Sequence, residues 1–302
     1  MSAAPGSWGS PGFGLPPAAD LVGPFPQRPF LEAWWRHRGA GEALIVGSPA
    51  GLVAAWRRPD GTVELAGEGD LTDYHAPLGP GAGEAVASLV TGLAPGTRFR
   101  FDSLPEEAAV AVAAGVARAG AEASLVEHAA TVILDLPGSR EEYLASLDGK
   151  ERHELRRKRR RFEAAFGPGR LVPAGSDGLA AFAAMHRAAP GAKGLFLTGE
   201  MEDFFRALLE IPGARLDLLA AADGVPLGAA FGFEDERAYY LYNSAYDPGA
   251  AAASPGVVLV DLLVQQAVES GRDRFDFLKG EEAYKLRLGG RRRPLFVVEG
   301  VR

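Results

Sequence analysis

The chain of 302 residues contains no cysteine. It therefore has no disulfide framework, no thiolate metal site and no cysteine nucleophile. Also missing are a Walker loop, a Gly-x-Ser-x-Gly elbow, a Gly-x-Gly-x-x-Gly turn after an expected strand and a His-Glu-x-x-His pair. These absences argue against P-loop nucleotide hydrolysis, serine hydrolysis, dinucleotide binding and zinc proteolysis. The five histidines show no metal-ligand spacing, so no metal is expected.

Long apolar runs are scarce as well. The Ala-rich stretch 108–123 is interrupted by Gly115, Arg118 and Gly120, and no basic segment followed by an apolar run opens the chain. A membrane-spanning helix needs about 20 consecutive apolar residues, and a secretory signal needs both of those N-terminal features. We therefore expect a soluble, cytoplasmic protein without a membrane span.

Charge is unevenly distributed. The whole chain carries a formal charge of -7, yet residues 150–161 contain eight Lys and Arg against two Glu. This segment alone is +6, so the remainder carries -13. A local basic patch on an acidic body attracts a phosphate-bearing ligand but does not favour a general DNA-binding protein.

Composition and length predict the domain organisation. The length favours about two domains. Residues 1–29 are rich in Pro and Gly with few periodic apolar positions, which is typical of a disordered tail. Residues 30–138 and 139–302 are then predicted as two domains.

The two domains share an order of elements. In the first half, strands near 43–46, 52–57 and 62–66 precede a helix at 83–91, a strand at 98–102, a helix after Pro105 and strands at 124–127 and 131–136. In the second half, three strands within 215–245 precede a helix at 255–270, a strand at 274–278, a helix at 281–288 and a strand at 294–301. Both halves read βββ-α-β-α-β, which indicates an internal duplication.

The second half resembles the GNAT (Gcn5-related) N-acetyltransferase superfamily. The residues that carry the likeness are Ser254-Pro255-Gly256 at a helix start, the run from Phe275 to Lys285, and Gly289. They resemble the acetyltransferase-like domain of cellulose-biosynthesis-associated (CelD-like) proteins, which is similar to the Fem-type peptidoglycan aminoacyltransferases. The resemblance covers residues 140–300, including the basic run 155–160, and reaches the first half only through element order.

The resemblance implies a fold and an activity. The fold class is α/β (α+β mixed sheet), with tandem GNAT-like domains of which the first is degenerate, each a mixed sheet flanked by helices. The activity is N-acyl transfer from acetyl-CoA or another acyl-CoA to an amine of a small molecule or saccharide precursor by direct attack. Two alternatives stay open. One is a Fem-type transferase that uses aminoacyl-tRNA, and the other is a catalytically inactive GNAT-fold binding module.

The helix that starts after Ser254 is the expected donor site. Ser254 is a good N-cap, Pro255 suits the first helical position, and Gly256 lets a ligand approach the backbone. Unpaired N–H groups at such a helix start attract anions, although an ordinary capped helix fits the same residues. The resemblance implies that these residues bind acyl-CoA, together with Asn243, Val257 and Tyr284. The sequence departs from the usual GNAT loop, because Asp247-Pro248-Gly249 and four alanines precede the cap.

Three residues are catalytic candidates. In GNAT enzymes two parallel strands separate beside the helix, and the resemblance places the strand with Tyr240 and Tyr242 there. We expect Tyr242 to contact the thiolate or acceptor and Tyr240 to bind substrate, or both to pack. Asp276 alternates with two Phe and is either a general base of raised pKa or a structural carboxylate. Lys285 is either a contact to donor phosphate or oxyanion, or a solvated helix lysine.

The remaining candidates concern acceptor and phosphate binding. Arg156 and Arg160 lie in the basic helix expected at 149–166, which is either a phosphate-binding wall or a solvated charged face. His75 is a candidate for lining a substrate cleft. His186, on a helix with Phe182 and Met185, is interpreted as a structural histidine.

Overall fold

The computed structural model describes residues 5–302, which form two compact units. Unit 1 comprises the residues up to Thr131 together with Arg293–Arg302, and unit 2 comprises Val132–Arg292. The division between the units falls after Thr131, whereas the sequence predicts it after residue 138. The last strand ends in unit 1 because it pairs antiparallel with the strand Arg98–Leu104, from Phe296↔Leu104 to Val301↔Arg98.

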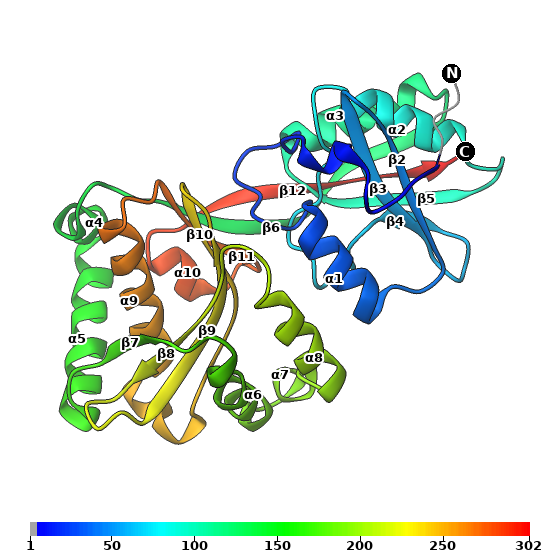
Figure 1. Ribbon diagram of the computed structural model, residues 1–302. Coiled ribbons are helices and arrows are strands. Elements are labelled where there is room, and N and C mark those ends of the chain that lie inside the picture. Colours follow the sequence, from blue (N-terminus) through cyan, green and yellow to red (C-terminus); the bar gives the residue numbers. More distant parts are fainter. Residues whose placement is uncertain (1–4) are drawn as a thin grey trace. The chain divides into compact units, whose positions relative to one another are not determined.

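Unit 1 is a mixed sheet with helices on it (Figure 1). Its strands follow the order β1-β2-β3-β4-β5-β12-β6. Their bounds are β1 Pro5–Gly6, β2 Glu42–Ser48, β3 Gly51–Arg57, β4 Val63–Leu65, β5 Arg98–Leu104, β6 Glu122–Asp135 and β12 Arg291–Val301, and β6 and β12 contribute to both units. The helices are the 3-10 turn η1 Pro11–Gly14, α1 Arg28–Arg38, α2 Ala82–Thr91 and α3 Glu106–Arg118. The two strands predicted at 124–127 and 131–136 are one strand, β6.

The tail predicted to be disordered is packed over its described part, residues 5–29. Phe13 and Phe25 are 7% and 0% exposed, and Phe25 meets the ring of Tyr74 at 6.2 Å. Pro17 forms an isolated β-bridge with Leu78. Each buried aromatic side chain contributes roughly 2 kcal/mol or more of burial, which offsets the ordering of the Gly and Pro residues between them.

Unit 2 is a three-layer arrangement (Figure 1). Its sheet has the order β6-β11-β10-β9-β8-β7, with β7 Arg170–Pro173, β8 Ala214–Ala220, β9 Pro226–Glu234, β10 Ala238–Tyr246 and β11 Arg274–Lys279. The helices are α4 Arg140–Ser146, α5 Gly149–Phe166, α6 Leu179–Ala188, α7 Ala192–Phe196, α8 Gly199–Leu208, α9 Pro255–Glu269 and α10 Ala283–Arg287, with the 3-10 turns η2 Gly175–Gly178 and η3 Pro248–Ala253. Helix α9 lies on one face of the sheet under α5, and α6 lies on the other face.

The core of unit 2 follows from apolar periodicity. Helix α9 buries Val258, Leu259, Leu263 and Val264 against the β9–β11 face, where Phe275 and Phe277 are also buried. Leu155 and Phe162 of α5 join this cluster, as their spacing predicts, and Phe166 packs at its edge. No helix within residues 5–302 combines the length and hydropathy of a bilayer span.

Candidate active site in unit 2

A gap opens between the two central parallel strands of unit 2. Strands β10 and β11 pair from Ala238↔Arg274 to Tyr240↔Asp276, and the pairing ends there although β10 continues to Tyr246 and β11 to Lys279. On its other side β10 stays paired with β9 throughout, so only the edge toward β11 loses its ladder. This is the strand separation that the sequence predicts beside α9.

A β-bulge lies at the start of the gap. The register with β9 shifts between Leu241 and Asn243, so Tyr242 is the extra residue. Its ring contacts Phe205, Phe231 and Phe233 at centroid distances of 5.6, 6.1 and 5.4 Å. Tyr242 is thus half-buried in an aromatic cluster, which matches the packing alternative for its ring.

The next residue, Asn243, is held by a histidine from α6. The Asn243 Oδ1 atom lies 2.6 Å from His186 Nε2, and His186 is 1% exposed. The His186 ring also packs on Phe182 and Phe196. Burial lowers the pKa of His186, and the Asn243 hydrogen bond opposes this only in part. A neutral imidazole therefore contacts Asn243, the residue expected to bind the donor.

Tyr240 is a structural residue. It is 1% exposed, and its hydroxyl donates to Asp235 Oδ2 at 3.0 Å across the β9–β10 turn. The expectation that Tyr240 binds substrate is corrected by this placement, because the phenol lies in the protein interior and its hydroxyl contacts a carboxylate of its own turn.

Asp276 marks the point where pairing ends on β11. It is 0% exposed, and its Oδ1 accepts a hydrogen bond from the Leu278 amide at 2.8 Å. Leu278 has a φ of +58°, a left-handed conformation that is strained for a branched residue. The carboxylate therefore supports a strained turn at the edge of the gap through its hydrogen bond with the Leu278 amide.

Lys285 reinforces the same turn. Its ammonium donates to the carbonyl oxygens of Lys279 and Gly280 at 2.6 and 3.1 Å, and it pairs with Glu282 at 2.9 Å. The residue is 4% exposed. Both expectations for Lys285 are thus corrected: it is neither a solvated lysine nor directed at a donor phosphate, because its hydrogen bonds are used to hold the end of β11.

Tyr284 packs against the core. Its ring meets Phe277 at 6.3 Å, and it lies at the edge of the main cluster of unit 2. Burial, followed by the nearby Glu282 charge, raises the pKa of its phenol. The phenol of Tyr284 therefore stays protonated, and its ring packs against the core beside Lys285.

The turn before α9 is more closed than expected. Asp247 Oδ1 accepts from the Gly249 amide at 2.9 Å, and the amides of Val257 and Val258 donate to the Ser254 carbonyl at 3.1 and 3.3 Å. Ser254 is the N-cap residue, but it has a φ of +59° and its side chain makes no capping bond.

One first-turn donor is left at this helix start. Pro255 has no N–H, and the Gly256 amide has no hydrogen-bond partner in the described part of the chain. A Cβ at Gly256 would lie 3.1 Å from the Tyr246 ring, so a larger residue is disfavoured there. The predicted anion cradle is therefore reduced to a single amide, because Asp247 and Ser254 accept hydrogen bonds from the other amides.

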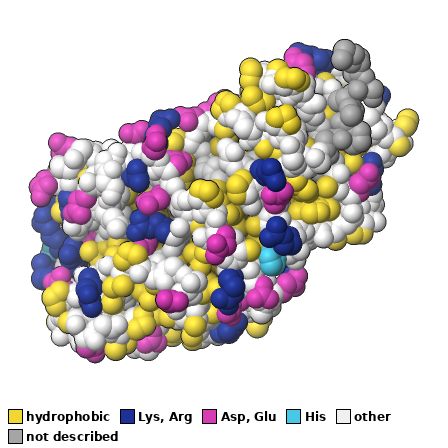
Figure 2. Space-filling model, viewed as in Figure 1, with side chains coloured by type: hydrophobic (Ala, Val, Ile, Leu, Met, Phe, Trp, Pro, Cys, Tyr) yellow, Lys and Arg dark blue, Asp and Glu magenta, His cyan; other side chains and the backbone are white. Residues whose placement is uncertain are grey.

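Helix α5 supplies positive charge next to this turn. Figure 2 shows Lys and Arg side chains gathered over α5. Arg161 donates to the Ala252 carbonyl at 3.2 Å, which ties α5 to η3. Arg159 lies 3.6 Å from the buried Asp261 of α9, and Arg140 binds that carboxylate with two bonds of 2.9 Å. Part of the basic run is thus compensated inside unit 2.

Other cations of α5 pair locally or stay exposed. Arg157 binds Glu154 through two bonds of 2.7 Å and holds the pKa of that carboxyl at about 2. Arg156 and Arg160 are exposed, and neither forms an ion pair or hydrogen bond within residues 5–302. They lie four residues apart on one face of α5 and remain the candidates for binding an anion.

His75 belongs to unit 1, where both of its ring nitrogens are used. Nδ1 lies 3.0 and 3.1 Å from the carbonyl and Oδ1 of Asp102, and Nε2 lies 2.8 Å from the Gly67 carbonyl. The residue is 4% exposed. The expectation that His75 lines a substrate cleft is corrected, because the imidazole joins the segment after β4 to β5.

This histidine fills the first unit's counterpart of the gap. Strands β4 and β5 are parallel and pair only at Val63↔Phe99 and Glu64↔Arg100, as β10 and β11 separate in unit 2. The His75 ring occupies this gap, because it bridges the Asp102 carbonyl of β5 and the Gly67 carbonyl after β4.

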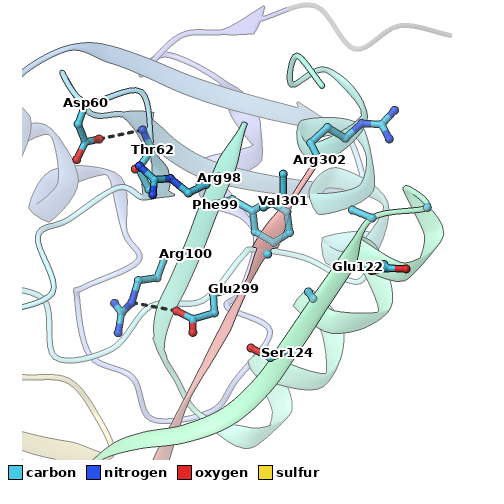
Figure 3. A pocket seen from close by; sticks show the side chains of 14 residues that line it. Asp60, Thr62, Arg98, Phe99, Arg100, Glu122, Ser124, Glu299, Val301 and Arg302 are labelled. Atoms are coloured by element: carbon cyan, nitrogen blue, oxygen red, sulfur yellow. Dashed lines mark hydrogen bonds and ion pairs between the residues drawn. The ribbon is translucent and has the colours of Figure 1, made fainter. Parts of the chain in front are cut away.

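A hollow of about 1110 Å³ lies elsewhere in unit 1 (Figure 3). Arg98, Arg100 and Arg302 line it together with Asp60, Glu122 and Glu299. Arg100 pairs with Glu299 at 3.4 Å, so the lining is close to neutral. None of the residues predicted to form the site contributes to this hollow.

Sequence reasoning missed two contacts of the site. His186 was interpreted as structural, and Arg161 was not separated from its basic neighbours. The apolar neighbours of His186 signal burial but not its partner, since the contact with Asn243 joins residues far apart in the chain. In residues 5–302 no group of three or more His, Asp or Glu side chains is arranged to hold a metal.

Comparison with known proteins agrees with this geometry. Residues 149–286 match the family model described as an acetyltransferase (GNAT) domain. The match covers α5 to α10, which includes the gap and the helix start beside it. Residues 149–286 are therefore similar to a GNAT acetyltransferase domain. No curated protein shows significant sequence similarity to the chain.

Solved structures extend the likeness to both units. A conserved protein of unknown function from Bacteroides thetaiotaomicron is 14% identical, covers 96% of this chain and 95% of its own, and has a TM-score of 0.65. FemX is 13% identical with a TM-score of 0.63 and coverages of 94% and 93%. L-PGS from Bacillus licheniformis is 14% identical with a TM-score of 0.61 and coverages of 92% and 93%. At these identities the likeness shows that the chain shares the fold of these proteins over both units.

Proposed function

We propose that the protein is an N-acyltransferase that uses unit 2 for chemistry. The observation that carries the proposal is the end of β10–β11 pairing at Tyr240↔Asp276 within a domain that matches the GNAT family. Backbone groups at an unpaired strand edge align an acyl carrier and polarise its carbonyl. The His75 contact across the equivalent gap of unit 1 supports assigning that unit a binding or supporting role.

The reaction is direct transfer. The nitrogen of a neutral amine attacks the thioester carbonyl of an acyl-CoA, with acetyl-CoA as the first candidate, and a C–N bond forms. The tetrahedral intermediate then breaks its C–S bond, and coenzyme A leaves as a thiol after the proton of the amine has been transferred. Because the chain has no cysteine, the acyl group cannot be held as a thioester on this chain and is transferred directly to the amine. The acceptor is a small amine or an amino group of a saccharide or envelope precursor. We also propose a cytoplasmic location, where acyl-CoA and aminoacyl-tRNA are both present.

Asp276 has two roles that a variant separates. As a general base it would accept the amine proton, and as a structural group it accepts the Leu278 amide. Asp276→Asn keeps an oxygen for Leu278 but cannot take a proton at neutral pH. A folded D276N protein with a more than 100-fold lower kcat supports the base role, and unchanged kcat assigns Asp276 to the turn alone.

A second donor class is favoured by a specific observation. The Asp247 carboxylate occupies the Gly249 amide in the turn where acyl-CoA pyrophosphate is expected to bind, while Arg156 and Arg160 are exposed without partners in the described residues. An aminoacyl-tRNA presents many phosphates to such a helix and needs no pyrophosphate loop. The likeness of fold to FemX over both units supports the same alternative.

One variant distinguishes the donors. Asp247→Ala frees the Gly249 amide and removes a negative charge, so we expect coenzyme A to bind at least five-fold tighter if the turn holds its pyrophosphate. Titration calorimetry of wild type and D247A with coenzyme A, and filter binding with aminoacyl-tRNA, provide the comparison. Asp223→Ala, which changes the similar Asp223–Val225 turn, is the matched control.

Transfer itself is tested with a donor panel. Wild-type protein is incubated with acetyl-CoA, longer acyl-CoAs and aminoacyl-tRNAs in the presence of amine acceptors, and product is detected by mass spectrometry. Transfer from one donor class supports the proposal. Absence of transfer from every donor, together with tight ligand binding, would instead favour the inactive binding module.

A further inference from the structure

The strongest feature that the proposed reaction leaves unused is the His186–Asn243 pair. It joins a fully buried imidazole on α6 to the first residue after the bulge on β10. Neither the aromatic cluster around Tyr242 nor the hydrogen bonds at the end of β11 require this pair. The pair places the Asn243 side chain on β10 just beyond the last residue that pairs with β11.

The contact fixes the tautomer of the histidine. Asn243 Oδ1 is an acceptor, so the Nε2 atom 2.6 Å away must donate. His186 Nδ1 is buried without a hydrogen-bond partner among residues 5–302. A proton on Nδ1 alone would place the Nε2 lone pair against the lone pairs of Asn243 Oδ1 at 2.6 Å. The stable arrangement is a neutral ring with its proton on Nε2.

The tautomer in turn orients the asparagine amide. With Oδ1 held by His186, the Nδ2 group takes the opposite branch of the side chain. Asn243 is half-buried, and its Nδ2 makes no hydrogen bond within the described residues. An amide N–H beside an unpaired strand edge is a preorganised donor for a carbonyl oxygen that gains negative charge.

We propose that Asn243 donates a side-chain hydrogen bond to the acyl carbonyl during transfer, and that His186 is the positioning residue that aims it. This inference rests on the proposed function. It assigns His186 a role that a purely structural histidine does not have, because the orientation of Asn243 depends on the Nε2–H donor. The effect is specific to the transition state, in which the carbonyl oxygen carries charge.

Three variants distinguish the role of the Asn243 amide from that of His186. Asn243→Asp keeps the acceptor for His186 but loses Nδ2, and kcat should fall about 100-fold or more with little change in KM. His186→Phe fits among Phe182 and Phe196 but removes the Nε2 donor, and kcat should fall about 10-fold. His186→Gln supplies an N–H in a similar place and should restore kcat to within about three-fold of wild type. His37→Phe, in unit 1, is the matched control.

Thermal unfolding of each variant completes the experiment. The inference is supported if the kcat values rank wild type, H186Q, H186F and N243D while the unfolding temperatures of H186Q and H186F stay similar. It is overturned if N243D keeps the wild-type kcat, or if H186Q and H186F lose kcat equally. In those cases wild-type activity still stands, so the proposed function survives. Only a wild-type protein inactive with every donor overturns both.

Discussion

The two gaps of this molecule begin alike and end differently. In each unit a parallel pair of strands holds for a short register, two residue pairs ending at Glu64↔Arg100 in unit 1 and three ending at Tyr240↔Asp276 in unit 2. In unit 1 the gap is then closed by an imidazole with both nitrogens engaged. In unit 2 no imidazole bridges the two strands in this way: His186 binds the Asn243 side chain of β10, and Lys285 binds backbone carbonyls at the end of β11. The two units therefore stabilise the ends of their separated strands by different contacts.

The largest loss of stability is expected when Lys285, which binds the backbone at the end of β11, is replaced. Lys285→Met removes a buried ammonium from several carbonyl oxygens and leaves them without donors, so the free energy of unfolding should fall by about 3 kcal/mol. Urea denaturation measures the loss. Arg287→Met, two residues later on the exposed side of α10, should change stability by less than about 0.5 kcal/mol. An equal effect of both substitutions would contradict the support role.

The second prediction concerns His75, which bridges the two strands at the gap of unit 1. His75→Gly deletes the bridge between Gly67 and Asp102, and unfolding should become easier by about 2 kcal/mol. Added imidazole should raise the melting temperature of H75G but not that of wild type, because it refills the first gap. The exposed His153→Gly, in α5, is the control for imidazole. If H75G abolished transfer while remaining folded, the first gap would have a direct role in chemistry.

A smaller effect, on the KM for the donor, is expected at Arg161 of α5. Arg161→Ala removes the bond to the Ala252 carbonyl and one positive charge beside η3, and we expect donor KM to rise about five-fold, equivalent to about 1 kcal/mol. The rise should shrink in high salt, where the charge is screened. Arg170→Ala, on the exposed edge strand β7, is the control, and a salt-independent change would argue for a structural cause.

The smallest effect concerns pH. Burial lowers the pKa of His186 in the folded state, so the unfolded chain binds its proton more readily. Stability from the neutral ring is complete above the unfolded pKa of about 6.5 and declines as the pH falls toward the lower folded pKa, by at most about 1.4 kcal/mol per pH unit. Denaturation of wild type and H186F across this range should differ in slope. Parallel curves would show that His186 titrates normally.

The sequence predicts the fold well because apolar periodicity and turns are local. The helix at 255–269 and the strand at 274–279 follow from their own residues. The tail was misjudged, since Phe13 and Phe25 are few in number but lie in pockets made by distant segments. The assignment of residues 293–302 to unit 1 depends on their pairing with β5, which no local pattern contains.

The site was harder to predict because its residues act through partners. Asp276 and Lys285 stand out in the sequence, yet no spacing predicts that each of them binds backbone groups at the end of β11. The closed loop at Asp247 follows from an Asx turn that the Asp-Pro-Gly run indicates only in retrospect. The contact between Asn243 and His186 requires both the bulge and the placement of α6, and neither is readable from spacing.

The last strand has a consequence for handling the protein. Because residues 293–302 belong to unit 1 and are reached only after all of unit 2, no single cut yields two complete halves. A fragment ending at Thr131 lacks the strand that pairs with β5. Separate expression of the first unit therefore requires a circularly permuted gene or a short artificial linker that rejoins its two pieces.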